Sequence, residues 1–343
     1  TGLFDLTSAV FNFNSGTVTG TPRLTAATLN IGNGSTGAAT FSMRSSSVLT
    51  GDVAAGQTIL IQGDGSNGSA TLTAANGFNN AGIITLQSIA DNQGAHLNVS
   101  SGTLTNAGTL NINADPTVAG SRTVGANLVN NGTVNVNTST TFSKSGGSYI
   151  NNNAFNIAAG QTLTINGSSQ AFTQAGGTLA ATGLFDLTSA AFNFNGGIVT
   201  GTPRLTAATL NIGNGSNGAA EFSTRSSSVL TGDVAAAQTI LIQGDNTNGS
   251  ATLTAANSFN NAGTISLQSV DGSGASSNLT VNSGTLTNSG TINFNPGGGG
   301  SRTLTTELAN SGIVNVSTSA TLGRSSADHT NSGTINVTGG DLT

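Results

Sequence analysis

Side chains capable of acid–base chemistry are few in this chain and are spread along its whole length. The 343 residues include 13 Asp and Glu, eight Lys and Arg, two His and no Cys. Enzymes that cleave polysaccharides need clustered carboxylates, or Lys and Arg acting together with calcium. The sequence contains no such cluster, so we expect a protein without a catalytic site.

The charged residues instead recur in the second half of the chain. Four basic residues and four aspartates return there in the same order: Arg23, Arg44, Arg122 and Lys144 return as Arg204, Arg225, Arg302 and Arg324, and Asp5, Asp52, Asp64 and Asp91 return as Asp186, Asp233, Asp245 and Asp271. A catalytic cluster is expected once per chain, whereas recurring charges indicate structural contacts. His96 and His329 do not recur, and we interpret both as solvent-exposed imidazoles.

Two Gly/Asn/Asp loops are the weak candidates for a metal site. They are Gln62–Gly68 around Asp64 and Gln243–Gly249 around Asp245. Calcium takes six to eight oxygen ligands, and one carboxylate per loop without the EF-hand spacing rarely suffices. We therefore predict bulging turns and no cofactor, with calcium as the lesser alternative.

The composition also narrows the class of protein. Charged residues make up 6% of the chain and aromatic residues 4%, and the net charge is −5. Eight basic residues give no patch for nucleic acid, and no apolar run approaches the ~20 residues of a membrane span. The absence of Cys suits an exported bacterial protein.

A long repeat covers nearly the whole chain. Residues 1–14 read TGLFDLTSAVFNFN and residues 182–195 read TGLFDLTSAAFNFN, so a second copy of the pattern begins at residue 182. We divide the chain into copy one, residues 1–181, and copy two, residues 182–343. Both ends fall inside the repeat, so we expect a segment of a longer polypeptide.

Each copy contains shorter units built on the pattern N-x-G-T-φ-N-φ, where φ is aliphatic or Phe. Asn106–Ile112 and Asn130–Val136 are clear examples. The last apolar residues of the seven units in copy one, which we expect to form one column, are Leu6, Ile31, Ile61, Leu86, Ile112, Val136 and Ile157. The units recur at intervals of roughly 20–30 residues, and repeats of this length indicate a solenoid.

The strand signals within each unit define the fold class. Short alternating patches bounded by Gly, Asn and Ser predict β-strands. We predict an all-β, right-handed parallel β-helix with about three short strands per rung and about fourteen rungs, seven in each copy.

Alternation along the strands predicts what stabilises the stack. In Thr133–Val136 the two valines face inward and Asn135 faces outward. The second Asn of each unit should then form a column whose amides hydrogen-bond from rung to rung. The expected members of this ladder are Asn30, Asn111, Asn135, Asn156, Asn211, Asn293, Asn315 and Asn336. We attribute the preceding N-x-G corner to left-handed backbone angles, which Asn and Gly tolerate.

The N-x-G-T-φ-N-φ units resemble the strand repeats of giant bacterial surface proteins, namely autotransporter passengers and filamentous-haemagglutinin-like adhesins. The resemblance implies an exported β-solenoid at the cell surface that acts as a fibre or adhesin. We therefore expect a structural stalk that self-associates end to end or laterally, without nucleic-acid partners or membrane insertion of this segment. Two alternatives remain: an adhesin that binds a glycan or a partner surface through loops around Asp64 and Asp245, and a polysaccharide-active enzyme.

Overall fold

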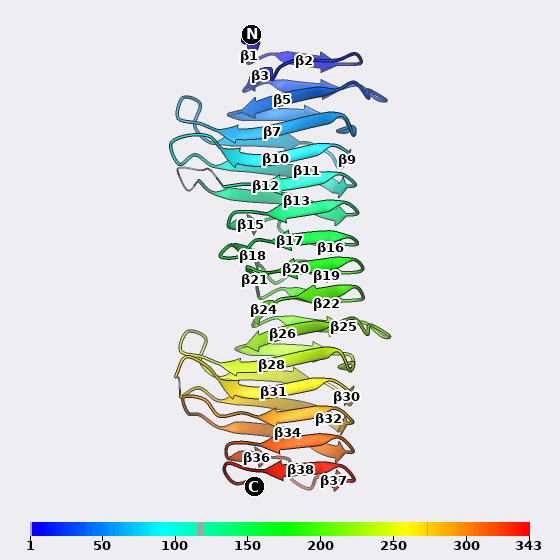
Figure 1. Cartoon of the computed structure of the whole chain (residues 1–343), viewed down its shortest axis with the longest axis vertical. Coiled ribbons are helices and arrows are strands. Elements are labelled where there is room, and N and C mark those ends of the chain that lie inside the picture. The colour runs from blue at the N-terminus through cyan, green and yellow to red at the C-terminus, as the bar shows by residue number, and fades with distance from the viewer. Residues whose placement is uncertain (1, 115–119, 273) are drawn as a thin grey trace. The chain divides into compact units, whose positions relative to one another are not determined.

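The computed structural model describes residues 2–114, 120–272 and 274–343, and these residues form β-strands joined by turns (Figure 1). No helix occurs in the described residues, and hence none that could cross a membrane. Neighbouring strands run parallel, and the chain winds as a β-solenoid of about fifteen turns. The predicted β-solenoid class is confirmed, with close to the expected number of turns.

Contacts between residues divide the chain into two compact units, which we describe separately. Unit 1 comprises Thr1–Ala171 and Gly177–Leu184, and unit 2 comprises Phe172–Gly176 and Phe185–Thr343. The division falls within residues 171–185, the interval in which the second sequence copy begins.

One sheet of unit 1 holds every first strand of a turn. Its strands, in spatial order, are β1 (Asp5–Thr7), β3 (Arg23–Thr25), β5 (Ala39–Arg44), β7 (Gln57–Gly63), β10 (Ile83–Ser88), β12 (Thr109–Ile112), β14 (Thr133–Val136), β17 (Ala154–Ile157) and β20 (Thr178–Ala181). The remaining strands of this unit are β2 (Val10–Phe13), β4 (Thr28–Ile31), β6 (Ser46–Thr50), β8 (Ala70–Ala74), β9 (Phe78–Asn80), β11 (Ala95–Asn106), β13 (Arg122–Asn130), β15 (Thr140–Phe142), β16 (Ser148–Asn151) and β18 (Thr162–Asn166).

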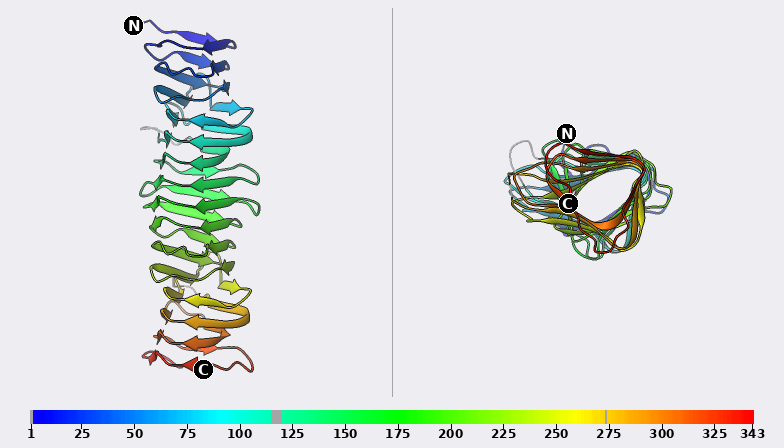
Figure 2. Two further views of the ribbon diagram at one scale, coloured as in Figure 1. Left: turned by 90° about the vertical axis from the view of Figure 1, so that its right-hand side faces the viewer. Right: turned by 90° about the horizontal axis from the view of Figure 1, so that it is seen from below.

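Unit 2 repeats this arrangement of parallel strands. β19 (Ala171–Gln174) belongs to unit 2 from Phe172 onward, and β21 (Leu184–Thr188) belongs to it from Phe185 onward. The strands that follow are β22 (Ala191–Phe194), β23 (Ile198–Thr200), β24 (Arg204–Thr206), β25 (Thr209–Ile212), β26 (Ala220–Arg225), β27 (Ser227–Thr231), β28 (Gln238–Gly244), β29 (Ala251–Ala255), β30 (Phe259–Asn261), β31 (Thr264–Ser269), β32 (Ser277–Asn288), β33 (Thr291–Phe294), β34 (Arg302–Asn310), β35 (Ile313–Val316), β36 (Ala320–Leu322), β37 (Thr330–Asn331) and β38 (Thr334–Val337). In Figure 2 the strands of successive turns lie side by side within each unit.

The core consists of inward columns of aliphatic side chains, as the alternation predicts. On β14, Val134 and Val136 are fully buried and Asn135 between them is only partly buried. The two valines stack on the Leu110–Ile112 pair of β12 and the Phe155–Ile157 pair of β17. Full burial of such a side chain contributes about 1.5–3 kcal/mol, so stability accumulates with each turn added.

The turns in the first part of unit 1 are shorter than the sequence spacing indicated. Leu6 pairs with Leu24, Leu24 with Met43, and Met43 with Ile61. The column therefore has two residues between Leu6 and Ile61, where the sequence predicted one. That expected residue, Ile31, lies on β4 in the other sheet, opposite Phe13. The predicted steps from Leu6 to Ile31 and from Ile31 to Ile61 are therefore wrong.

The number of strands per turn also varies. Three strands, β7, β8 and β9, form one turn as predicted, but β1 and β2 suffice for the first turn. In the turn after β10, a single long strand, β11, pairs with both β8 and β9. Its pairing with β13 shifts in register between Asn98 and Thr103, because the chain bends there between two faces.

Candidate functional site: side-chain ladders between turns

The outward-facing asparagines form hydrogen-bonded ladders, but in more than one column. In unit 1 the Nδ2 of Asn135 donates to Oδ1 of Asn111 at 2.9 Å, and the Nδ2 of Asn156 donates to Oδ1 of Asn135 at 2.9 Å. Asn30 lies on the other sheet, where its Nδ2 donates to Oδ1 of Asn12 at 2.8 Å and its own Oδ1 accepts from Thr50. The single column expected from the sequence is therefore two columns on two sheets.

Unit 2 contains the equivalent pair of columns. The Nδ2 of Asn211 donates to Oδ1 of Asn193 at 2.7 Å. In the other column two amides each donate to the Asn one turn earlier in the chain. The Nδ2 of Asn315 donates to Asn293 at 2.9 Å, and the Nδ2 of Asn336 donates to Asn315 at 2.9 Å. This column starts at Ser266, whose hydroxyl accepts from Nδ2 of Asn293 at 3.2 Å.

A second ladder, buried in the interior, is formed by the first Asn of the repeat pattern. In unit 1 the Nδ2 of Asn80 donates to Asn106 at 2.7 Å, that of Asn106 to Asn130 at 2.8 Å, and that of Asn130 to Asn151 at 2.8 Å. All four of these residues are fully buried. In unit 2 the corresponding ladder is Asn261, Asn288, Asn310 and Asn331, with each step at 2.7 Å, and only its last member, Asn331, is exposed.

The amides of the buried ladder also fasten the backbone of the next turn. The Nδ2 of Asn106 donates to the carbonyl of Thr133 at 3.0 Å, and the Nδ2 of Asn130 donates to the carbonyl of Ala154 at 2.8 Å. A buried polar group costs about 1–3 kcal/mol when it loses its partner, so the register of adjacent turns is fixed by these bonds. The corner predicted for this Asn does not include its role in a ladder, although its recurrence at the start of every clear unit indicates one.

The glycine of the N-x-G corner is required by close approach and not by a left-handed backbone. The backbone φ angle is not positive at Gly108 or Gly132. It is not positive at Asn106 or Asn130 either. A Cβ on Gly108 would overlap the carbonyl oxygen of Gly82, and one on Gly132 would overlap that of Gly108. The corners of successive turns therefore stack without room for a side chain, and the expected left-handed explanation is wrong.

Asp64, the first metal candidate, closes a tight loop at the end of β7. Its Oδ1 accepts from the backbone N–H groups of Ser66 at 2.8 Å and Asn67 at 2.7 Å, and its Oδ2 is bound by Arg44. Burial raises the pKa of Asp64, but hydrogen bonds from Asn67 and Arg44 outweigh burial and hold that pKa below its usual value. This carboxylate already has a structural cation in Arg44.

Asp245 repeats the arrangement in unit 2. Its Oδ1 accepts from the backbone N–H of Thr247 at 2.8 Å, and its Oδ2 is bound by Arg225. Burial raises the pKa of Asp245, and bonds from Asn248 and Arg225 again lower it further than burial raises it. Among the described residues, no three His, Asp or Glu side chains are grouped as they would be around a metal ion.

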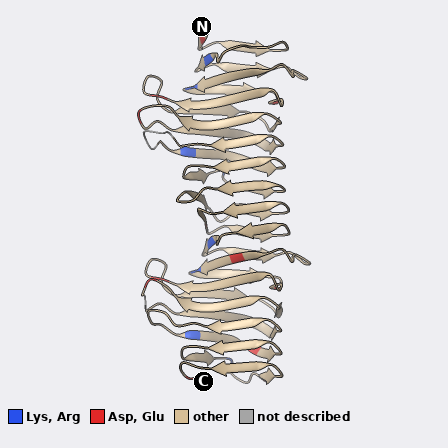
Figure 3. Cartoon of the chain, viewed as in Figure 1, with Lys and Arg blue, Asp and Glu red and all other residues tan. Residues whose placement is uncertain are grey.

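The other basic side chains also serve the fold, and Figure 3 shows how sparsely charge is distributed. Arg302 is 2% exposed, and its guanidinium donates to the carbonyls of Asn295 at 3.0 Å and Gly299 at 3.1 Å. Burial lowers its pKa. Arg122 holds the carbonyls of Asn113 and Gly120 in the same manner.

Lys144 and Arg324 occupy equivalent positions and bind the bend of a long strand. The Nζ of Lys144 donates to the carbonyls of Val99 and Ser100, both at 2.8 Å, and Arg324 donates to the carbonyl of Gly284 at 2.6 Å. Arg23 and Arg204 pair with the aspartates Asp5 and Asp186. All eight basic residues therefore make structural contacts.

The two histidines differ in their surroundings. His96 is half-buried and its Nδ1 lies 2.8 Å from the hydroxyl of Thr123, so the expectation of an exposed imidazole is wrong for this residue. Burial and the charge of Arg122 lower the pKa of His96. His329 is exposed, and its Nδ1 accepts from the backbone N–H of Leu308 at 3.2 Å.

Comparison with protein families, with characterised proteins and with solved structures finds no match for this chain.

Proposed function

We propose that this chain is a structural segment of an extracellular fibre or stalk and has no enzymatic activity. The supporting observation is the pair of buried amide ladders, each of which joins several consecutive turns by hydrogen bonds of 2.7–2.8 Å. A ladder of this kind resists sliding and separation of turns, which is the mechanical requirement of a stalk. The proposed setting is the bacterial cell surface, as in autotransporter passengers and filamentous-haemagglutinin-like proteins.

The low charge supports self-association as part of this function. Several β-branched side chains on outward faces are 38–56% exposed: Val10, Val48, Ile83, Val229 and Ile313. Few charges surround them, so repulsion between molecules is weak. We propose that molecules associate laterally through these faces, or end to end by stacking turn on turn.

Electron microscopy of native cells with a labelled antibody against this chain tests the proposal. The expected result is label along thin fibres outside the cell. Label confined to the cell interior, or carried by discrete globular particles, would contradict it.

A mechanical measurement tests the supporting observation directly. Pulling the protein from both ends in a single-molecule experiment should give high unfolding forces and extension steps that correspond to blocks of turns. Unfolding in one step at a force typical of loosely packed domains would count against a load-bearing role.

A further inference from the structure

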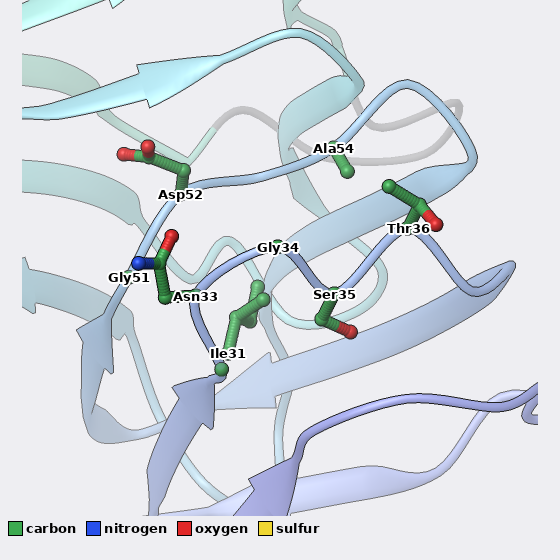
Figure 4. Close-up of a pocket in the computed structure, with 9 residues that line it drawn as sticks. Ile31, Asn33, Gly34, Ser35, Thr36, Gly51, Asp52 and Ala54 are labelled. Carbon is green, nitrogen blue, oxygen red and sulfur yellow. The ribbon is translucent and has the colours of Figure 1, made fainter.

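A cavity whose lining combines polar and apolar groups occurs at the same place in both units. In unit 1 its volume is about 550 Å³, and it lies between the loop after β4, which includes Asn33, Ser35 and Thr36, and the segment Gly51–Ala54. Figure 4 shows Asn33 and Asp52 toward one end of the cavity and Ser35 and Thr36 toward the other. The second cavity measures about 590 Å³ and is lined by the equivalent side chains Asn214, Ser216, Asn217 and Asp233.

A buried glutamine ties the two walls of each cavity together. Gln57 is fully buried; its Nε2 donates to the carbonyl of Ser35 at 2.9 Å, and its Oε1 accepts from the backbone N–H of Ala54 at 2.9 Å. Gln238 makes the same two bonds in unit 2, both at 2.8 Å. The distance between the walls is therefore fixed before any ligand arrives, which lowers the entropic cost of binding.

The carboxylate in each cavity is held in one orientation. The Oδ1 of Asp52 accepts from the backbone N–H of Asn79 at 2.7 Å, and its Oδ2 accepts from the Asn79 amide at 3.1 Å. Asn260 holds Asp233 with bonds of 2.7 and 3.0 Å. Each carboxylate oxygen retains lone pairs that face solvent, because Asp52 and Asp233 are both exposed.

The other polar groups of the cavity are not used by the fold. Within the part of the chain that the structure describes, no hydrogen bond engages the side chain of Asn33 or Thr36, in contrast to the asparagines of the ladders. The hydroxyl of Ser35 is buried without a partner among the described residues, and so is that of Ser216 in the second cavity. The groups that a ligand can reach are therefore an oriented carboxylate, the exposed amide of Asn33 or Asn214, and either the hydroxyl of Thr36 in the first cavity or the amide of Asn217 in the second.

This chemistry selects the class of ligand. Among the described residues that line the cavities, none is basic, as an anion would require, and none is aromatic, as a flat apolar ligand would favour. A carboxylate accepts from two neighbouring hydroxyls, and an amide both donates and accepts. We propose that each cavity binds a neutral saccharide unit, with adjacent hydroxyls on the carboxylate of Asp52 or Asp233.

Two equivalent sites on one chain imply multivalent attachment to a glycan surface. Each site alone is expected to bind weakly, since it is open to solvent, whereas two sites raise the avidity when both are engaged. This proposal is independent of the stalk function, because a stalk without saccharide sites would keep its ladders and its fibres.

Binding of the whole chain to an array of neutral and uronate-containing glycans tests the inference, followed by titration with the strongest neutral saccharide. Binding to neutral glycans is expected, and Asp52→Asn combined with Asp233→Asn should weaken it about tenfold or more. Asp91→Asn combined with Asp271→Asn is the matched control, because it removes two charges from other loops, and it should leave binding unchanged. Melting curves show whether all variants are folded.

Single variants separate affinity from avidity. Asp52→Asn alone should reduce retention on a glycan surface strongly, while the remaining site keeps its dissociation constant for the free saccharide. Failure of every neutral glycan to bind the wild-type chain would overturn the inference. So would neutral-glycan binding that the Asp52→Asn/Asp233→Asn variant retains, or binding that chelators abolish.

Discussion

The buried amide ladder can be tested against the outer ladder within one repeat unit. Asn106 and Asn111 are the first and second asparagines of the same unit, Asn106–Ile112, and each contributes one amide to a ladder. Asn106 is fully buried, whereas Asn111 is only partly buried. Replacing each by Ala removes the same side chain from the same repeat unit, and the two changes differ in burial and in the number of hydrogen bonds lost.

The expected loss follows from the groups that each substitution leaves unpaired. Asn106→Ala removes the acceptor of the Asn80 amide and the donor to Asn130 Oδ1 and to the carbonyl of Thr133. Asn80 keeps a bond to the carbonyl of Thr109, so the loss amounts to roughly one or two unsatisfied buried groups, about 3 kcal/mol. Asn111→Ala frees one amide that water can reach, and we expect less than about 1 kcal/mol.

Hydrogen exchange measured by mass spectrometry is the suitable assay, because a solenoid need not unfold in one step. Asn106→Ala should accelerate exchange in β9, β11 and β13, the strands that carry Asn106 and its ladder neighbours, and lower the denaturant midpoint. Asn111→Ala should leave both nearly unchanged. Equal effects of the two substitutions would refute the conclusion that burial makes the inner ladder the stronger one.

Three further outcomes are expected. Gly108→Ala should lower the melting temperature strongly because of the clash with the Gly82 carbonyl, whereas Gly56→Ala, whose Cβ would meet its nearest neighbours at an ordinary 3.5 Å, should be nearly neutral in the same assay. Asp64 has a lowered pKa, so its contribution to stability is present above pH about 4 and lost as the pH falls through its folded pKa; a urea midpoint that does not fall in acid would contradict this. Burial raises the pKa of Tyr149 to about 12, so stability should fall by about 3 kcal/mol between pH 10 and 12 as the unfolded chain ionises first. Absorbance at alkaline pH should show no tyrosinate near pH 10 in the folded protein, which is a clean measurement because this is the only Tyr and Trp is absent.

The sequence predicts the inside and outside of each strand well, because alternation is a local property. Val134 and Val136 face inward and Asn135 outward, as expected. The step from Asn106–Ile112 to Asn130–Val136 also predicts the length of one turn correctly, since Thr109 pairs with Thr133.

Alternation does not determine which face of the solenoid a strand joins. The tetrapeptide TLNI occurs at residues 28–31 and 109–112, with the same burial pattern in both places. The first copy of it, β4, pairs with β2 and β6, whereas the second, β12, pairs with β10 and β14 in the other sheet. The face depends on the length of the preceding turn, which is set by distant pairing and not by the four residues.

The candidate saccharide sites could not be predicted for a related reason. Gln57 is an ordinary polar residue at the start of a strand in the sequence, and only the fold brings it between the carbonyl of Ser35 and the N–H of Ala54. The composition of the loops around Asp64 and Asp245 suits a metal, yet their carboxylates are bound by arginine. Composition indicates which groups are present, but not which of them the fold leaves free.

Ladder and cavity occupy separate parts of each unit, and this separation has a physical cause. The buried ladder of unit 1 begins at Asn80 because the residue paired with it one turn earlier is Val53, and the Oδ1 of Asn80 consequently has no partner among the described residues. Unit 2 repeats this start at Asn261, after Val234. Each cavity lies on the N-terminal side of that start, where the shorter turns leave room for a projecting loop after β4 or β25. Turns joined by buried amides thus alternate along the sequence with turns that carry free polar groups, as expected if the proposed stalk also carries the proposed saccharide sites.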